Sequence, residues 1–341
     1  LNSGTPATGA TTSNTPATGG SASGSSIKVG LVTDVGKVDD KSFNQSAWEG
    51  VKDAATTNGY QAQYIETADQ KDYATNIQKF VDQKYDIIVT VGFLIADATE
   101  KAAIANPNIQ FIGVDQFQDP SKQHPKNFTG LVFEEDKAGY LAGALAAYMS
   151  KSGHIGAVLG TDNVPPVYRY GEGYRQGALS VNSSIKVDTI YHEDNNAFND
   201  PDWGSKTAGT LISQGADVIF GAGGKTGNGA LVGIAQNAAQ SGKTLYAIGV
   251  DTDQYLTVPE AKAVLLSSAT KDLKGGTSDL VTKAANKQAP GGNYTGKVGL
   301  APFHDLDSKV SADVKSKLTK LTQDLTSGAV KTNVAPVKPS K

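Results

Sequence analysis

The stretch that sets the fold is Ile27-Lys-Val-Gly-Leu-Val-Thr-Asp34, a short apolar run that ends in a polar turn. The same pattern returns at Tyr85-Asp-Ile-Ile-Val-Thr-Val91 and at Ile109-Gln-Phe-Ile-Gly-Val114. Segments with helical spacing, at 42–58, 73–83 and 96–105, separate these runs. Apolar strands that alternate with helices are typical of a parallel sheet covered on both faces. We therefore expect an α/β unit that begins at residue 27.

A second series of the same kind follows residue 134. Helical spacing at 135–149, 168–181, 205–214 and 229–240 alternates with strand-like runs at 154–159, 185–191, 217–220 and 244–250. Two series of similar length predict the fold class: α/β, with two doubly wound parallel-sheet lobes. A further strand at 263–269, a helix at 273–286 and a charged amphipathic helix at 310–325 complete the pattern.

Composition excludes several classes of function. The chain has 341 residues and a net charge of -3, so it offers no basic surface for nucleic acid or for a membrane. It has no Cys, and its four His residues are widely separated, which argues against disulfides, Cys nucleophiles and zinc. It contains no run of about 18 apolar residues that could span a bilayer. We expect neither a metal nor a cofactor.

Residues 1–26 differ in composition from everything that follows. Apart from Leu1 they are Gly, Ser, Thr, Ala, Pro and Asn, and the run Thr5-Pro-Ala-Thr-Gly9 recurs at 15–19. Such a segment cannot bury enough apolar surface to fold, so we expect a disordered linker. Its natural role is to tether the folded part to a membrane anchor outside this sequence; a tail without a role is the alternative.

Polar residues stand where the predicted strands end. Asp34, Asp115 and Asp251 each follow a strand, Gly92-Phe93 follows another, and a glycine-rich run at 221–229 opens a helix. In open α/β sheets, ligands bind outside the carboxyl ends of the strands. The glycine-rich run would let backbone N–H groups approach a polar ligand. We expect one cleft shared by both lobes.

Several catalytic motifs fail on inspection. Gly224-Lys-Thr and Gly242-Lys-Thr end like a P-loop, but the glycine that must precede each is replaced by Ile219 and Asn237. Asp251-Thr-Asp253 begins like a calcium loop and lacks its later ligands. A Gly-x-Ser-x-Gly elbow is absent from the sequence. These failures favour a binding protein over an enzyme.

The densest cluster of chemical groups is Thr33 to Gln45, between the first strand and the first helix. Asp39, Asp40 or Ser42 can cap that helix. Phe43 and Asn44 would then face the strand ends. An aromatic ring beside an amide and carboxylates suits a flat ligand that stacks on the ring and hydrogen bonds along its edge.

Six segments together resemble one family. The chain is similar to the basic membrane protein family of bacterial ABC-transporter substrate-binding lipoproteins, whose best-understood members are purine nucleoside receptors. The similarity covers about residues 27–305. The segments that carry it are Asp34 to Asn44, Phe111 to Asp115, Glu134-Glu-Asp-Lys-Ala-Gly-Tyr-Leu-Ala-Gly143, Gly223 to Gly229, Gly249-Val-Asp-Thr-Asp253 and Ser268-Ala-Thr-Lys-Asp272.

The resemblance implies a type I periplasmic-binding-protein fold with the ligand between the lobes. The first lobe would comprise residues 27–133 and 262–298, and the second 134–261 and 299–335. The chain would cross between them near 133, within 252–262 and within 290–300.

The resemblance also implies roles for individual residues. The base would lie between two aromatic residues, Phe43 and Phe220. Three polar side chains would contact the edge of the base: Asp34, Asn44 and Asp115. The ribose would be held by Asp251, Lys271 and Gly224. Phe93, Trp203 and Lys225 are further candidates, the last two because they depart from the family pattern.

The expected function is capture of a purine nucleoside outside the cytoplasm by a monomeric, lipid-anchored partner of an ABC permease. Guanosine or inosine should precede adenosine, because a carboxylate can accept their N1–H. One alternative is the same fold with a sugar or autoinducer as ligand. The other is a calcium-dependent nucleoside hydrolase, whose motif Asp34, Gly36, Asp39 and Asp40 imitate without its leading Asp.

Overall fold

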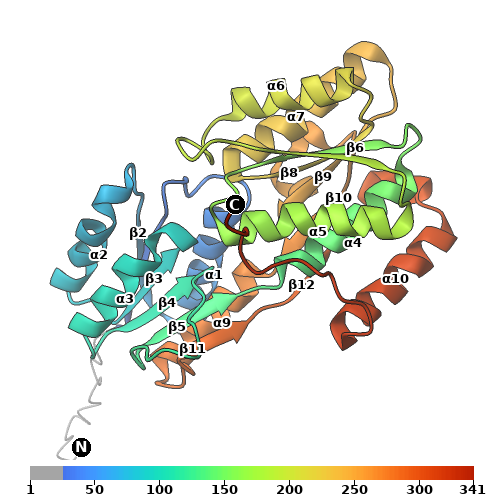
Figure 1. Ribbon diagram of the computed structural model, residues 1–341. Helices are drawn as coiled ribbons and strands as arrows, with labels where there is room; N and C mark the ends of the chain where they lie inside the picture. Colours follow the sequence, from blue (N-terminus) through green and yellow to red (C-terminus); the bar gives the residue numbers. More distant parts are fainter. Residues whose placement is uncertain (1–25) are drawn as a thin grey trace, which may run out of the picture.

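A computed structural model describes residues 26–341, which form two α/β lobes (Figure 1). Residues of both lobes line a cleft between them. The predicted fold class is confirmed: each lobe is built on one six-stranded sheet with helices on both faces. The predicted linker at 1–26 lies outside the described residues, apart from Ser26.

The first lobe has the strand order β11-β5-β4-β3-β1-β2, and all neighbouring strands in it run parallel. The strands are β1 (Lys28–Val32), β2 (Gln61–Ile65), β3 (Ile87–Val91), β4 (Gln110–Val114), β5 (Phe128–Val132) and β11 (Gly292–Thr295). Helices α1 (Phe43–Asn58) and α9 (Leu273–Ala285) cover one face, and α2 (Tyr73–Asp82) and α3 (Ala96–Ala105) cover the other.

Strand β1 shows why the sequence forms this sheet. Val29 and Leu31 point into the core beneath α1 and α9, whereas Val32 packs on the α2 face. Gly30 also faces α2, where a Cβ would lie 2.7 Å from the Phe80 ring. An apolar side chain on each side of the strand requires a helical layer on each side of the sheet.

The second lobe has the order β12-β10-β9-β8-β6-β7, parallel except for the short β12, which runs antiparallel to β10. Its strands are β6 (His154–Leu159), β7 (Lys186–Tyr191), β8 (Val218–Ala222), β9 (Tyr246–Asp251), β10 (Leu265–Lys271) and β12 (Val298–Leu300). Helices α4 (Glu135–Met149), α5 (Pro165–Val181) and α10 (Ala312–Ser327) lie on one face, α6 (Pro201–Ser213) and α7 (Gly224–Ser241) on the other, and the short α8 (Gln254–Thr257) follows β9.

The expected boundary at residue 262 is wrong. β10 pairs in parallel with β9, so it belongs to the second sheet, and only α9 and β11 return to the first lobe. Leu266 and Ala269 of β10 pack into the second-lobe core, which is the physical reason for this placement. The chain therefore crosses after β5, after β10 and after β11.

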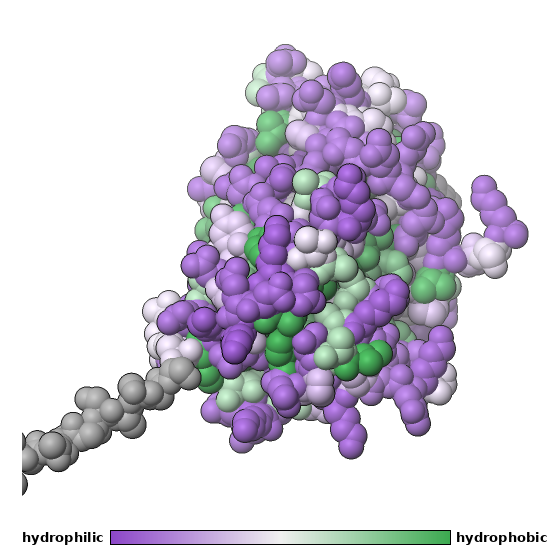
Figure 2. All heavy atoms as spheres, turned by 90° about the vertical axis from the view of Figure 1, so that its left-hand side faces the viewer, coloured by the Kyte–Doolittle hydropathy of each residue, from purple (hydrophilic) through white to green (hydrophobic). Residues whose placement is uncertain are grey.

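The face of the molecule that lies on the left of Figure 1 is largely polar. Figure 2 shows hydrophilic side chains over most of this face, with hydrophobic areas between them. Within residues 26–341, none of the helices has the length and apolar character needed to cross a bilayer.

Helices α4 and α5 approach each other closely because glycines line their contact. A Cβ at Gly143 of α4 would overlap the carbonyl oxygen of Tyr174, and one at Gly177 of α5 would overlap that of Tyr140. Since both obstacles are helix backbone, neither can move without sliding a whole helix. The pair supports the wall of the cleft, because Tyr170 on α5 lines it.

We predict that Gly143→Ala lowers the free energy of unfolding by about 1–3 kcal/mol, the usual cost of overpacking a close contact. Urea denaturation followed by circular dichroism measures this change. Gly209→Ala in α6 is the matched control, because a Cβ there meets only Asn237 Nδ2 at 3.9 Å. The control should be neutral or stabilising by about 0.5–1 kcal/mol. Equal stability of the two variants would contradict the prediction.

Candidate functional site

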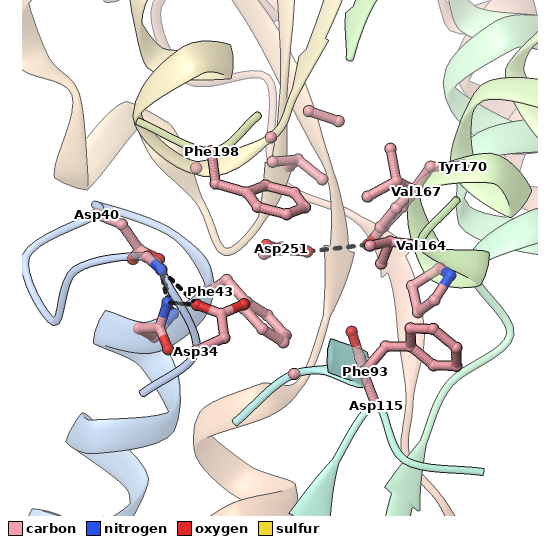
Figure 3. Close-up of a pocket in the computed structure, with 18 of the residues that line it drawn as sticks. Asp34, Asp40, Phe43, Phe93, Asp115, Val164, Val167, Tyr170, Phe198 and Asp251 are labelled. Atoms are coloured by element: carbon pink, nitrogen blue, oxygen red, sulfur yellow. Dashed lines mark hydrogen bonds between the residues drawn. The ribbon is translucent and has the colours of Figure 1, made fainter. Parts of the chain in front are cut away.

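The cleft lies where the carboxyl ends of the strands in both sheets face each other (Figure 3). The space outside protein atoms there is about 590 Å³, part of it open to solvent. Both lobes contribute polar and apolar groups to its lining. The predicted residues that line it are Asp34, Phe43, Asn44, Phe93, Asp115, Gly224, Asp251 and Lys271.

Two of the aspartates sit in a strained backbone conformation. Asp115, directly after β4, has φ 61°, and Asp251, at the end of β9, has φ 68°. Residues other than glycine rarely adopt this left-handed region, and holding one there costs about 1–3 kcal/mol. A glycine would relieve the strain, so the carboxylates themselves account for the choice of residue at the two positions.

A network of hydrogen bonds fixes the first-lobe wall. The Asp40 carboxylate accepts from the backbone N–H groups of Ser42, Asn44 and Gln45 and so caps α1. Asn44 Nδ2 donates to Asp34 Oδ1 at 3.0 Å and to Asp40 Oδ2 at 3.1 Å. Both N–H bonds of the amide are thereby used. Asn44 Oδ1 is buried without a partner among the described residues, which leaves a free acceptor.

Lys271, at the end of β10, lies at the centre of the cleft floor. Its Nζ donates to Asp115 Oδ2 at 2.6 Å and to Glu135 Oε1 at 3.2 Å. The ammonium also lies 5.0 Å from the centre of the Phe43 ring. Three of its partners come from different elements, so Lys271 ties β4, α4 and α1 together. Asp115 Oδ1 remains a buried acceptor without a partner in the described chain.

Burial shifts the acid–base behaviour of these groups. Loss of hydration raises the pKa of Asp34 and Asp115 to about 6 and the pKa of Asp251 to about 7. Burial alone would lower the pKa of Lys271, but Asp115, Glu135 and Asp251 raise it above its usual value. Lys271 is therefore a permanent cation, while the aspartates titrate near neutral pH.

Two phenylalanine rings lie on opposite sides of the cleft. Figure 3 shows Phe198 of the second lobe and Phe43 of the first lobe facing the same space. Phe198 lies in the loop between β7 and α6, and its carbonyl accepts from Lys225 N at 3.0 Å. A side chain at Gly160 would collide with its ring, so that glycine makes room for it. A flat group could lie between the two rings.

The prediction that Phe220 stacks on a ligand is wrong. Its side chain is fully buried within the second-lobe core, 5.3 Å from the ring of Tyr174 and 5.8 Å from that of Tyr170. Phe220 is interior to β8, and only the end of that strand reaches the cleft. Phe198 occupies the place that the sequence analysis gave to Phe220.

The three further candidates have different locations. Trp203 packs in the second-lobe core, where its ring lies 4.5 Å from that of His192, and it does not line the cleft. Lys225 pairs with Asp39 at 3.0 Å on the rim, also outside the lining. Phe93, 39% exposed, lies at the mouth and does line the cleft.

Side chains of the second lobe donate hydrogen bonds to backbone carbonyl groups of the loop that follows β1. Asn199 Nδ2 donates to Val35 O at 2.6 Å and Asn228 Nδ2 donates to Asp40 O at 2.7 Å. Gln254 Nε2 and Thr257 Oγ1 both donate to Lys41 O. The lobes are thus closed on each other at this edge of the cleft.

The carboxylates that imitate the hydrolase motif have separate tasks. Asp40 caps α1, and Asp39 points outward to Lys225. Asp34 accepts from Gly36 N at 2.7 Å and from Asn44. Within residues 26–341, no group of three or more His, Cys, Asp or Glu is arranged to hold a metal ion.

Sequence reasoning missed Phe198, Tyr170 and Glu135 as parts of the site. A signal for Phe198 was present: Phe198-Asn199 repeats the dipeptide Phe43-Asn44, and both follow a strand end. Tyr170 lies within a helix, with its hydroxyl 3.4 Å from Asp251 Oδ1 and 3.2 Å from Ala269 O. The packing of α5 against α4 and the second sheet brings it there.

Comparison with known proteins gives one family. The model of the Bmp family, described as PnrA-like ABC transporter substrate-binding proteins, matches residues 27–325. A CD4+ T-cell-stimulating antigen of Listeria monocytogenes is 33% identical, covering 91% of this chain and 88% of that protein. The ABC transporter nucleoside-binding protein BmpA of Lactococcus lactis subsp. cremoris is 32% identical, covering 89% and 88%.

Solved structures agree on the fold. An ABC transporter solute-binding protein of Aeropyrum pernix K1 superposes with a TM-score of 0.79, covering 89% of this chain and 92% of that one at 23% sequence identity. This likeness confirms the two-lobed fold of periplasmic solute-binding proteins that the resemblance implied.

We predict that the ligand-free protein becomes less stable as pH rises from 5 to 8. The folded-state pKa values of Asp34, Asp115 and Asp251 lie above the ordinary value of 3.8, so folding favours their protonated forms. Their stabilising contribution is present at low pH and is lost as pH rises through about 6 to 7. The free energy of unfolding should fall by on the order of 2 kcal/mol, measured by urea denaturation.

Asp251→Asn should reduce this pH dependence and make the protein more stable at pH 8. Asp97→Asn, on the exposed surface of α3, is the control and should keep the wild-type slope. A stability that is flat between pH 5 and 8 in the wild type would show that the three aspartates are not buried as described.

Proposed function

Because the chain belongs to the Bmp family of PnrA-like ABC transporter substrate-binding proteins, we propose that its cleft captures a purine nucleoside for import by an ABC permease. One observation carries the choice of ligand. Among the residues that line the cleft with Phe43 and Phe198, the buried side-chain atoms without a partner in the described chain are both acceptors, Asn44 Oδ1 and Asp115 Oδ1. They call for a flat ligand whose edge donates hydrogen bonds.

The acceptors favour particular bases. Guanosine presents N1–H and N2–H on its Watson–Crick edge, and inosine presents N1–H. Adenosine has an unprotonated N1, which would face a carboxylate or an amide oxygen without a proton between them. Leaving such a buried group unpaired costs about 1–3 kcal/mol. Purines also offer more area than pyrimidines for stacking on the two rings. Guanosine or inosine is therefore the proposed ligand.

The ribose would lie toward the second lobe. Asp251 supplies an acceptor, Lys271 has a third N–H beyond the two given to Asp115 and Glu135, and Gly224 opens α7 beside them. Vicinal hydroxyls, each able to donate and accept, suit this combination. The positive φ of Gly224, 55°, keeps the loop backbone close to the cleft.

The charge balance favours a nucleoside over a nucleotide. Five buried carboxylates surround the cleft floor, and the ammonium of Lys271 is held by two of them. The five are Asp34, Asp40, Asp115, Glu135 and Asp251. A phosphate would have to enter this acidic surrounding while Lys271 is already neutralised, at a high cost in free energy.

The proposed function also implies where the protein acts and which protein it delivers its ligand to. The Lactococcus relative is a protein named for nucleoside binding, which supports the ligand class. The present protein, as a substrate-binding protein, would act outside the cytoplasm as a lipid-anchored monomer. It would deliver its ligand to a permease. Binding without turnover is expected, since Asp40 caps α1 and Asp115 and Glu135 pair with Lys271.

We predict saturable binding of guanosine and inosine, weaker binding of adenosine, and weaker binding still of cytidine and uridine. Isothermal titration calorimetry at one pH gives the order, and chromatography should recover each nucleoside unchanged. 2′,3′-Dideoxyguanosine should bind about 10- to 150-fold more weakly, because charged partners of the ribose lose hydrogen bonds.

Three results would contradict this assignment. Adenosine binding as tightly as guanosine would show that the acceptors do not read N1. A hexose binding more tightly than any nucleoside would favour the sugar-binding alternative. Free base released in proportion to protein would favour the hydrolase.

We predict that Phe198→Ala lowers guanosine affinity about 5- to 100-fold, because stacking of a base on an aromatic ring contributes about 1–3 kcal/mol. The same titration measures it. Phe117→Ala is the control, since Phe117 is 66% exposed and outside the cleft lining. Unchanged affinity in Phe198→Ala, with Phe43→Ala impaired, would mean that only the first lobe stacks on the base.

A further inference from the structure

A line of charged groups leads from the cleft to the surface of the second lobe. It begins at Asp115, continues through Lys271, and reaches Glu135 at the start of α4. Glu135 is fully buried and its Oε2 accepts from Arg169 Nε at 3.0 Å and from Arg169 Nη2 at 2.5 Å. Arg169, on α5, is the outermost member, with 19% of its side chain exposed.

Arg169 has a further contact outside this line. Its Nη1 donates to the carbonyl oxygen of Pro336 at 3.0 Å. Pro336 belongs to residues 329–341, here named the strap, which follows α10. Figure 1 shows the strap in dark red, running from the end of α10 across α4 and α5 toward the gap between the lobes.

The strap is attached at several points along this path. Val330 packs against Tyr140 and Leu141 of α4, and Thr332 donates to Asp136. Beyond Pro336, Lys338 pairs with Asp162 at 2.7 Å. The strap then reaches the mouth of the cleft, where Val337 to Lys341 line an open pocket together with Phe93 of the first lobe.

Arg169 contacts two partners with different N–H groups of its guanidinium, Glu135 and Pro336. The planar guanidinium directs Nε and Nη2 to Glu135 and Nη1 to the strap, so the carbonyl of Pro336 fixes the plane of the fork. Because Glu135 Oε2 accepts from two N–H groups of Arg169, the orientation of the guanidinium plane influences the position of the Glu135 carboxylate. Glu135 Oε1 in turn accepts from Lys271 Nζ at 3.2 Å, so it contributes, together with Asp115, to the position of this ammonium between the two lobes.

We propose that Arg169 is a positioning residue for the ligand cleft and that the strap holds it in place. The strap thereby adjusts the affinity of the cleft from the outer surface of the second lobe, through Glu135 and Lys271. The effect on affinity rests on the proposed function, whereas the effect on Lys271 does not.

The test uses three variants of the full chain. The first replaces residues 334–341 with an equal length of Gly and Ser, which removes the docked segment without placing a new terminal carboxylate beside Arg169. The second is Arg169→Lys, which keeps the charge and loses the fork. The third combines both changes. Lys331→Ala, at an exposed position of the strap away from Arg169, is the control.

Guanosine affinity is measured for each by calorimetry. We expect the strap variant and Arg169→Lys each to bind about 3- to 30-fold more weakly, the range found for residues that act through a network. The combined variant should bind no more weakly than the weaker of the two, because both changes break the same line of contacts. Lys331→Ala should bind like the wild type.

A second readout does not depend on ligand. The ¹⁵Nζ resonance of Lys271, assigned by its loss in Lys271→Met, should shift in the ligand-free strap variant and stay in place in Lys331→Ala. Unchanged guanosine affinity in the strap variant, or losses that multiply in the combined variant, would overturn the proposal while the nucleoside function stands. If the wild type binds no nucleoside, the proposed function fails. If the Lys271 resonance also stays in place in the strap variant, the proposed effect of the strap on Lys271 fails as well.

Discussion

The ammonium group of Lys271 lies between carboxylates of the two lobes, and the rest of the cleft depends on this arrangement. Asp115 comes from the first sheet and Glu135 from the first helix of the second lobe, 2.6 and 3.2 Å from Lys271 Nζ. A buried ammonium is costly unless it is paired on several sides, and removal of one partner leaves an uncompensated charge. The ion pair therefore favours the closed arrangement of the lobes and defines the floor on which a ligand rests.

The topology explains how these groups meet. β4 and β10 lie in different sheets, and their carboxyl ends face each other because the chain crosses between the lobes directly after β10. Asp115 and Asp251, both at strand ends and both with positive φ, extend the acidic surface on either side. Phe43 and Phe198 then close the space from above and below (Figure 3). Each lobe supplies one ring and at least one acceptor, so binding and closure of the cleft are linked.

The sequence predicted local features well and long-range ones unevenly. The apolar strands, the two-lobed fold and the strand-end aspartates follow from short patterns, and Asp34, Asp115 and Asp251 all line the cleft. The prediction for Phe220 failed because this residue lies within β8 and its side chain points into the core, whereas the second-lobe phenylalanine that lines the cleft, Phe198, is in a loop. The boundary at 262 failed because the partner of β10 is decided by packing of Leu266 and Ala269, which no local pattern encodes. Glu135 and Arg169 depend on contacts between α4, α5 and β10, and spacing alone does not reveal them.

The proposed function requires that the unpaired acceptors of the cleft, Asn44 Oδ1 and Asp115 Oδ1, select a purine nucleoside. Native mass spectrometry tests it most directly, with the protein incubated in an equimolar mixture of nucleosides, nucleotides, nucleobases, hexoses and amino acids. The account predicts one bound molecule per chain with the mass of guanosine or inosine. A hexose, an amino acid or a nucleotide as the bound species would contradict it.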